Sequence, residues 1–118
     1  MEMVDLMREI HFLTGEGKGT VYEAALIRAE KKSNYELQSD KLKSVLAAIK
    51  DAYFNDMPVT KGEVKALADS RYRDAIIIKN KALKEMLEAE ATWAKRLNRL
   101  EGVKALLIAE QTIAKNLK

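Results

Sequence analysis

The 118-residue sequence contains no cysteine and only one proline. Without cysteine the chain has no disulfides, thiolate nucleophiles or zinc–thiolate sites, and this composition fits a reducing compartment. It also lacks any run of about 18 apolar residues, the length that a membrane-spanning helix needs. Its first five residues include Glu2 and Asp5, where a secretory signal would carry lysines. The sequence therefore predicts a cytoplasmic protein with no membrane contact.

Residues that perform acid–base or nucleophilic chemistry are also scarce. His11 is the only histidine, and the sequence gives it neither clustered metal ligands nor the partners of a catalytic triad. Residues 15–20 (GEGKGT) invite comparison with a phosphate-binding loop, but Leu13 stands where the first glycine is needed and no strand precedes it. We therefore predict a non-enzyme with no catalytic residues, cofactor, metal or small-molecule substrate. We interpret residues 15–20 as a hinge; the alternative is an anion held by Lys18 and the N–H groups at the start of the next helix.

The composition is typical of long amphipathic helices, because 33% of the residues are charged, 47% are hydrophobic and only five are glycines. The longest predicted helix covers about residues 60–117, and Thr60 and Glu63 form a T-x-x-E capping box at its start. Its apolar residues recur in alternating steps of three and four, the spacing of a coiled-coil seam. This predicted seam consists of Val64, Ala68, Tyr72, Ala75, Ile78, Ala82, Met86, Ala89, Trp93, Leu97, Leu100, Val103, Leu107, Ala114 and Leu117.

Two further helices are predicted, at about residues 2–14 and 21–54. Thr20 and Glu23 form a second capping box at the start of residues 21–54, and Pro58 prevents that helix from continuing. The apolar stripe of the first helix is Met3, Leu6, Met7, Ile10 and Leu13. The seam of the second helix is Tyr35, Leu42, Val45, Ile49 and Ala52, with an apolar patch at Ala24, Ala25, Leu26 and Ile27 near its start.

Chain lengths then limit how these helices can pack. If the chain reverses near Met57, residues whose numbers add up to about 115 face each other, and the second helix covers the third only to about Trp93. We expect the first helix to cover the part of the third helix beyond Trp93, with Leu6, Ile10 and Leu13 opposite residues 102–109. Alternatively, a second subunit covers it. The predicted fold is a single all-α domain, a long antiparallel helical hairpin with a short N-terminal helix packed on the overhanging end.

Charge is unevenly distributed along the chain. Residues 1–58 carry eight Lys/Arg and ten Asp/Glu, a net charge of −2, whereas residues 59–118 carry thirteen and eight, a net charge of +5. Such asymmetry favours an acidic partner such as nucleic acid, but it is equally compatible with attraction between the two halves of a hairpin. With few acids near Arg96, Arg99 and Lys104, we predict a non-specific nucleic-acid site made of Lys18, Lys95, Arg96, Arg99 and Lys104.

Apolar residues outside the seam favour protein–protein contact. Residues 75–78 (AIII) are apolar around the whole helix, and residues 106–108 form a second wide band. One hairpin seam cannot cover all of these side chains, which predicts a protein partner or a homo-oligomer. The predicted interface residues are Ile76, Ile77, Leu106 and Ile108.

Several short segments also resemble a known group of proteins. Residues 63–66 (EVKA), 71–74 (RYRD), 88–91 (EAEA) and 99–101 (RLE) resemble small helical proteins of phages and prophages that are often encoded near recombination and single-strand-binding genes. The resemblance covers about half the chain and implies no catalytic residues. It implies a mobile-element accessory that acts as a scaffold or modulator in nucleic-acid transactions. The alternatives are an inhibitor of a host factor, such as a defence nuclease, and a structural coiled-coil component of a phage particle.

Overall fold

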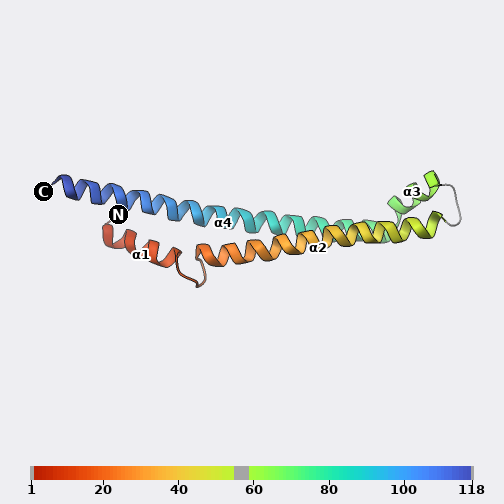
Figure 1. Ribbon diagram of the computed structural model, residues 1–118, viewed down its shortest axis with the longest axis horizontal. Coiled ribbons are helices and arrows are strands. Elements are labelled where there is room, and N and C mark those ends of the chain that lie inside the picture. The colour runs from red at the N-terminus through yellow and green to blue at the C-terminus, as the bar shows by residue number, and fades with distance from the viewer. Residues whose placement is uncertain (1, 55–58, 118) are drawn as a thin grey trace. The chain divides into compact units, whose positions relative to one another are not determined.

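The computed structural model describes residues 2–54 and 59–117, and it leaves out the side chains of residues 54, 59, 60 and 62–64. The elements in this part of the chain are α-helices, in the order α1 (Met3–Leu13), α2 (Val21–Phe54), α3 (Val59–Ala68) and α4 (Ser70–Asn116) (Figure 1). No strand occurs among these residues. The all-α prediction is confirmed, and the first two helices begin and end within one residue of their predicted bounds.

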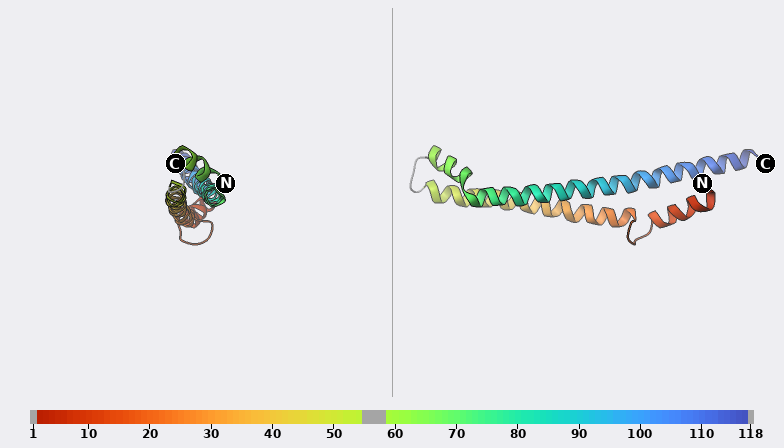
Figure 2. Two further views of the ribbon diagram at one scale, coloured as in Figure 1. Left: turned by 90° about the vertical axis from the view of Figure 1, so that its right-hand side faces the viewer. Right: turned by 180° about the vertical axis from the view of Figure 1, so that it is seen from behind.

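The chain forms two compact units, each described here by itself. The first unit contains Met1–Ala29 and Glu88–Lys118, and in it α1 and the start of α2 pack along the second half of α4. The second unit is Glu30–Leu87, in which the rest of α2 packs against α3 and the first half of α4. Within each unit α2 and α4 run side by side in opposite directions (Figure 2). This arrangement confirms the predicted antiparallel hairpin.

Ion pairs between α2 and α4 report the register of the hairpin. In the first unit Arg28 Nη2 lies 3.1 Å from Glu90 Oε1, and in the second unit Lys31 Nζ lies 3.4 Å from Glu85 Oε2. The paired residue numbers, 28 with 90 and 31 with 85, add up to 118 and 116. Both values are close to the predicted sum of about 115, so these ion pairs agree with the predicted register of α2 and α4.

Much of the predicted seam is buried, but several positions are not. The fully buried core includes Ala24 and Ile49 on α2 and Ala82, Ala89, Leu100 and Val103 on α4. Ala52, Ala68, Ile78 and Leu117, all predicted as seam residues, are exposed. Ile78 lies three residues after Ala75 and four before Ala82, which favours it for the seam, but the structure exposes Ile78 and half-buries Ile76, four residues after Tyr72.

The third predicted helix, 60–117, is not continuous. It is interrupted at Asp69, which belongs neither to α3 nor to α4. The carboxylate of Asp69 caps α4, since its Oδ1 accepts a 2.8 Å hydrogen bond from the backbone N–H of Arg71. Helix α3 begins at Val59, so Thr60 lies within the first turn instead of preceding it. The side chains of the predicted Thr60–Glu63 capping box lie outside the described part of the chain.

Helix α1 covers the second half of α4, as predicted. Leu6 and Leu13 are buried, Ile10 is half-buried, and Glu9 forms an ion pair with Arg99 of α4. Met3 and Met7 are exposed, contrary to the predicted stripe. Residues 6, 10 and 13 share one side of a helix with 3.6 residues per turn, and that side faces α4, so the two methionines lie on its flank.

The loop between α1 and α2 is held by the predicted Thr20–Glu23 capping box. The buried Thr20 hydroxyl accepts a hydrogen bond from the Glu23 N–H (3.1 Å) and donates one to the Gly17 carbonyl (2.6 Å). The Glu23 carboxylate returns to the loop and accepts from the Gly19 N–H at 3.2 Å. Gly19 has a φ of 82°, and a Cβ built there would lie 3.1 Å from Phe12 Cζ, so this position favours glycine.

One buried hydroxyl on α2 gives a stability prediction. Ser39 Oγ is buried and has no hydrogen-bond partner among the described residues. We expect Ser39→Ala to raise the free energy of unfolding by about 0.5–1.5 kcal/mol, because it removes an unsatisfied buried hydroxyl and improves helix propensity. Ser44→Ala is the matched control, since Ser44 is exposed on the same helix and reports propensity alone. Equal gains in urea unfolding for the two variants would contradict a desolvation cost at Ser39.

Candidate functional site

The predicted nucleic-acid site includes Arg96, which lies beside the loop between α1 and α2. Arg96 Nη1 donates hydrogen bonds to the Thr20 carbonyl and to Glu23 Oε1, each at 3.0 Å. The side chains of Arg96 and Glu23 are about three-quarters buried, with exposed fractions of 26% and 28%. Arg96, followed by the Gly19 N–H, lowers the pKa of the Glu23 carboxyl below its ordinary value. Arg96 therefore fastens α4 to the capped start of α2.

Arg99, one turn further along α4, is held by α1. Its guanidinium forms a bidentate ion pair with the Glu9 carboxylate, in which Arg99 Nη2 lies 2.8 Å from Glu9 Oε2. This hydrogen bonding raises the pKa of Arg99 above its ordinary value. A planar, bidentate pair restrains the orientation of both side chains in addition to attracting them, so Arg99 helps to position α1 on α4.

The remaining predicted nucleic-acid residues are more exposed. Lys104 lies 3.8 Å from Glu101 one turn away, an exposed pair of small energetic value. Lys18 and Lys95 are exposed, and Lys18 is near enough to Glu23 to help lower the pKa of that carboxyl. The expectation that Arg96, Arg99 and Lys104 have few acids nearby is therefore wrong, because each has a carboxylate partner. Nucleic-acid binding by these residues stays a prediction.

Charge also differs between the two units. The first unit, which holds all five predicted nucleic-acid residues, contains nine Lys/Arg and nine Asp/Glu, a net charge of zero. The second unit contains twelve and nine, so it accounts for the whole excess of +3. The excess of positive charge therefore belongs to the sequence of Glu30–Leu87 and not to the unit that holds the predicted nucleic-acid residues. The exposed cations of Glu30–Leu87 include Lys41, Lys43, Lys65, Arg73 and Lys81.

Trp93, the only tryptophan, is half-buried on α4. The Arg28 guanidinium carbon lies 4.3 Å from the centre of its ring, and the same guanidinium pairs with Glu90. A cation over a tryptophan face is attracted by the negative charge density of the ring. One face of the Trp93 ring is therefore occupied by Arg28, and its partial burial agrees with its predicted place in the seam.

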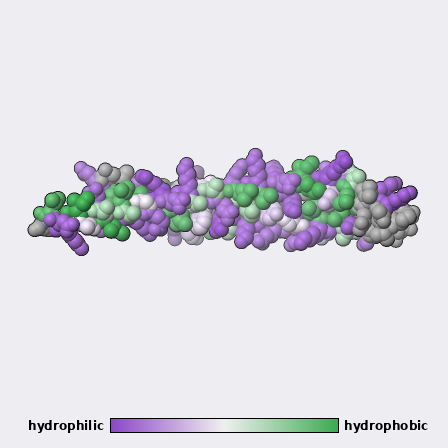
Figure 3. All heavy atoms as spheres, turned by 90° about the horizontal axis from the view of Figure 1, so that it is seen from above, coloured by the Kyte–Doolittle hydropathy of each residue, from purple (hydrophilic) through white to green (hydrophobic). Residues whose placement is uncertain are grey.

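Large apolar side chains are exposed on several helices, and the predicted interface residues are among them. Ile77, Leu106 and Ile108 are 65%, 51% and 63% exposed, whereas Ile76 is half-buried. Figure 3 shows hydrophobic atoms gathered near the C-terminal end of α4. Beyond the prediction, the structure adds two groups of exposed apolar residues to the first unit. These are Met3, Val4 and Met7 on α1 and Ile113 and Leu117 on α4.

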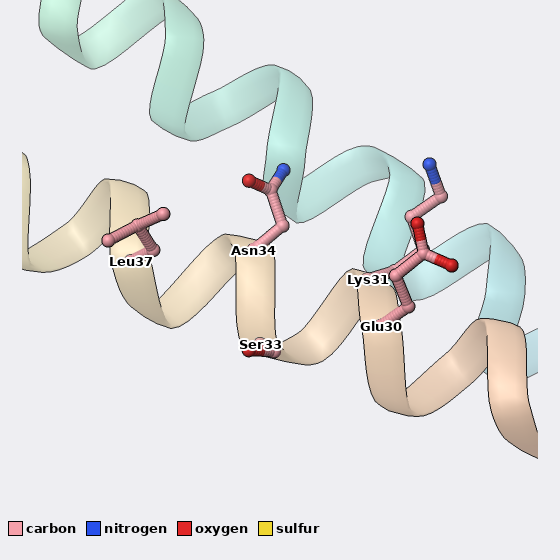
Figure 4. Close-up of a pocket in the computed structure, with 5 residues that line it drawn as sticks. All are labelled: Glu30, Lys31, Ser33, Asn34 and Leu37. Carbon is pink, nitrogen blue, oxygen red and sulfur yellow. The ribbon is translucent and has the colours of Figure 1, made fainter.

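Two open hollows lie on the described part of the surface, and each is lined by residues of one helix. One is lined by Glu30, Lys31, Ser33, Asn34 and Leu37 of α2, where Asn34 points toward α4 and Ser33 lies on the other side of the α2 ribbon (Figure 4). A second lies on α1 and is lined by Val4, Met7, Arg8 and His11.

One cluster of polar side chains was not predicted from the sequence. At the start of α4 the Asp69 carboxylate accepts hydrogen bonds from the Arg71 guanidinium at 3.0 Å and from the Tyr53 hydroxyl of α2 at 2.8 Å. Asp69 has a side chain only 10% exposed, and the bonds from Arg71 and then Tyr53 lower the pKa of its carboxyl well below the ordinary value. The same carboxylate raises the pKa of the Tyr53 hydroxyl.

Within residues 2–54 and 59–117 no group of three or more His, Cys, Asp or Glu side chains could hold a metal ion. None of the helices described is long and apolar enough to cross a membrane. Comparison with protein-family models, with curated proteins and with solved structures found no match. The resemblance to phage and prophage accessory proteins stays a prediction.

Proposed function

We propose that this protein is a non-enzymatic helical scaffold that works by protein–protein contact, with a second copy of the chain as its first partner. The observation that supports this best is a second apolar strip on α4. Val103, Leu107 and Ala114 lie toward the seam, while Leu106, Ile113 and Leu117 remain 51%, 54% and 82% exposed. Steps of seven and four residues place these three side chains on one side of the helix.

Charge in the first unit favours a second copy over a polyanion there. Its nine basic and nine acidic residues leave no net charge, so two copies approach without net repulsion, whereas nucleic acid gains little long-range attraction. Exposed apolar strips beside a formed core are typical of protein interfaces. The scaffold would thus join copies of itself through the C-terminal part of α4, with the apolar side of α1 nearby.

The test is the solution mass of the wild-type protein and of Leu106→Ser/Ile113→Ser. We expect light scattering to give a multiple of the chain mass for the wild type, rising with concentration, and the monomer mass for the double variant. Both side chains are more than half exposed, so helical circular dichroism should persist. Ile77→Ser is the matched control, because Ile77 is equally apolar and exposed but lies in the other unit. A monomeric wild type, or an unchanged mass in the double variant, would contradict the proposal.

The second candidate function is a modulator of nucleic-acid transactions, as the phage resemblance implies. The observation that favours it is the excess of three positive charges in Glu30–Leu87. Such binding would be non-specific, and each lost phosphate contact would reduce the salt slope of affinity by roughly 0.7–0.9 units. We expect Lys41→Ala/Lys43→Ala to weaken retention on DNA at low salt more than Lys95→Ala does. No retention of the wild type on single- or double-stranded DNA would exclude this candidate.

A variant of the predicted basic residues separates a structural role from a binding role. Lys95→Ala/Arg96→Ala/Arg99→Ala should lower the melting temperature, because Arg96 and Arg99 connect α4 to Glu23 and Glu9. Lys95→Ala alone should leave it unchanged. Unchanged melting of the triple variant, together with lost DNA affinity, would instead assign these cations to a nucleic-acid site.

A further inference from the structure

Helices α3 and α4 meet at a junction that their local sequence does not require. The residues concerned are Ala68, Asp69 and Ser70, with no proline or glycine among them. Sharp interruptions of helices are normally caused by proline, by glycine or serine pairs, or by a side chain that enters the hydrogen-bond ladder. Here Asp69 lies outside both helices, and its side chain forms contacts that keep it there.

Three kinds of hydrogen bond hold Asp69 in this position. Its Oδ1 accepts from the backbone N–H of Arg71 at 2.8 Å, replacing the Leu67 carbonyl that a continuous helix would offer. The Arg71 guanidinium binds both carboxylate oxygens at 3.0 Å, a contact within the junction itself. The third bond comes from a different helix, since the Tyr53 hydroxyl on α2 donates to Oδ2 at 2.8 Å.

These bonds compete with a continuous helix. Ala68 and the residues around it are good or tolerable helix formers, and joining α3 to α4 would restore the backbone bonds that Ser70 and Arg71 lose at the interruption. The Asp69–Arg71 bonds join residues of the junction itself and do not depend on α2. The bond from Tyr53 connects the junction to α2. The last turn of α3 is also docked, because Ala66 is fully buried. A change in the direction of α3 therefore changes what this helix packs against.

We infer that the α3–α4 junction is a two-state hinge, in which the Tyr53 hydroxyl on α2 holds the interrupted form and its loss lets α3 and α4 join into one helix. The hinge makes the direction of α3 depend on the contact between α2 and the start of α4. Anything that separates these two helices near Tyr53 releases α3. This conformational device is independent of the self-association proposed above, which uses the first unit.

Backbone NMR of the full chain tests the hinge residue by residue. In the wild type, Asp69 should show a non-helical Cα chemical shift, and the Ser70 amide should exchange rapidly with solvent. In Tyr53→Phe, which removes only the hydroxyl, the Asp69 shift should move toward the helical value, and Ser70 and Arg71 amide exchange should slow at least tenfold. Asp69→Ala removes the cap itself and should give the same shift and protection at Ser70 and Arg71.

Tyr35→Phe is the matched control, because Tyr35 is a half-buried tyrosine on the same helix and in the same unit. It should leave the shifts of residues 66–73 unchanged. A helical Asp69 shift in the wild type, or a non-helical Asp69 shift retained in Tyr53→Phe, would overturn the inference. Loss of the α2 and α4 shifts throughout the Tyr53→Phe chain would overturn it too, because the hydroxyl would then hold the hairpin and not the junction.

Discussion

Leu6→Ala is expected to lower the free energy of unfolding by about 2–4 kcal/mol, the usual cost of truncating a buried leucine. Leu6 is 1% exposed and is one of only two fully buried side chains on α1. An 11-residue helix is too short to be stable by itself in water, so α1 depends on this contact for its structure. We therefore expect urea unfolding at lower concentration, and loss of hydrogen-exchange protection that begins in α1.

Met7→Ala provides the control for this prediction. Met7 is the next residue along the same helix, but its side chain is 57% exposed, so its truncation leaves no cavity. Its effect on the free energy of unfolding should stay below about 1 kcal/mol. Similar losses for the two variants, or α1 amides that remain protected in Leu6→Ala, would show that α1 is not docked through Leu6.

The sequence predicted the helices well wherever a local signal ends them. Helix α2 ends at Phe54, four residues before the proline in the sequence, and the glycines of residues 15–20 separate α1 from α2. The Thr20 hydroxyl caps α2 as its T-x-x-E pattern indicates. Chain length then determined the register, because an antiparallel hairpin with a short connection can pair its helices in few ways. Both the helix ends and the register can thus be predicted from neighbouring residues and from the number of residues in each helix.

The interruption at Asp69 was missed because its cause is not local. Asp69 and Ser70 are common at helix starts, yet apolar residues continue on both sides with helical spacing, so the pattern favours one uninterrupted helix. The deciding contact comes from the Tyr53 hydroxyl, 16 residues earlier on α2. The spacing of apolar residues does not predict this hydrogen bond, because Tyr53 is not one of the predicted seam residues.

The pairing of the cations could be predicted only in part. The expected register already placed Glu23 about one turn from Arg96, so their ion pair was accessible from the sequence. The pairing of Arg99 with Glu9 was not, because the loop before Thr20 sets the offset of α1 along α4. Side chains that look unneutralised along the sequence can therefore be neutralised across a hairpin.

Trp93→Ala is expected to lower the free energy of unfolding by about 3 kcal/mol, near the lower end for truncating a large aromatic because the residue is half-buried. Trp93 lies on the seam side of α4, between the buried Ala89 and the half-buried Leu97. Its loss also leaves Arg28 without the ring beneath its guanidinium. Because Trp93 is the only tryptophan, its fluorescence in the native protein reports directly how well it is shielded.

Arg28→Met separates the two contributions of Trp93. This variant keeps an apolar chain over the ring but removes the cation, so it should cost only about 0.5–1 kcal/mol for the lost cation–π contact. Arg28→Met also removes the half-exposed ion pair between Arg28 and Glu90, whose loss adds little to the cost. A much larger loss in Trp93→Ala than in Arg28→Met would assign most of the stabilisation to packing of the indole in the hairpin. Wild-type melting of Trp93→Ala, with solvent-exposed tryptophan fluorescence in the native protein, would remove Trp93 from the core and contradict the α2–α4 register around it.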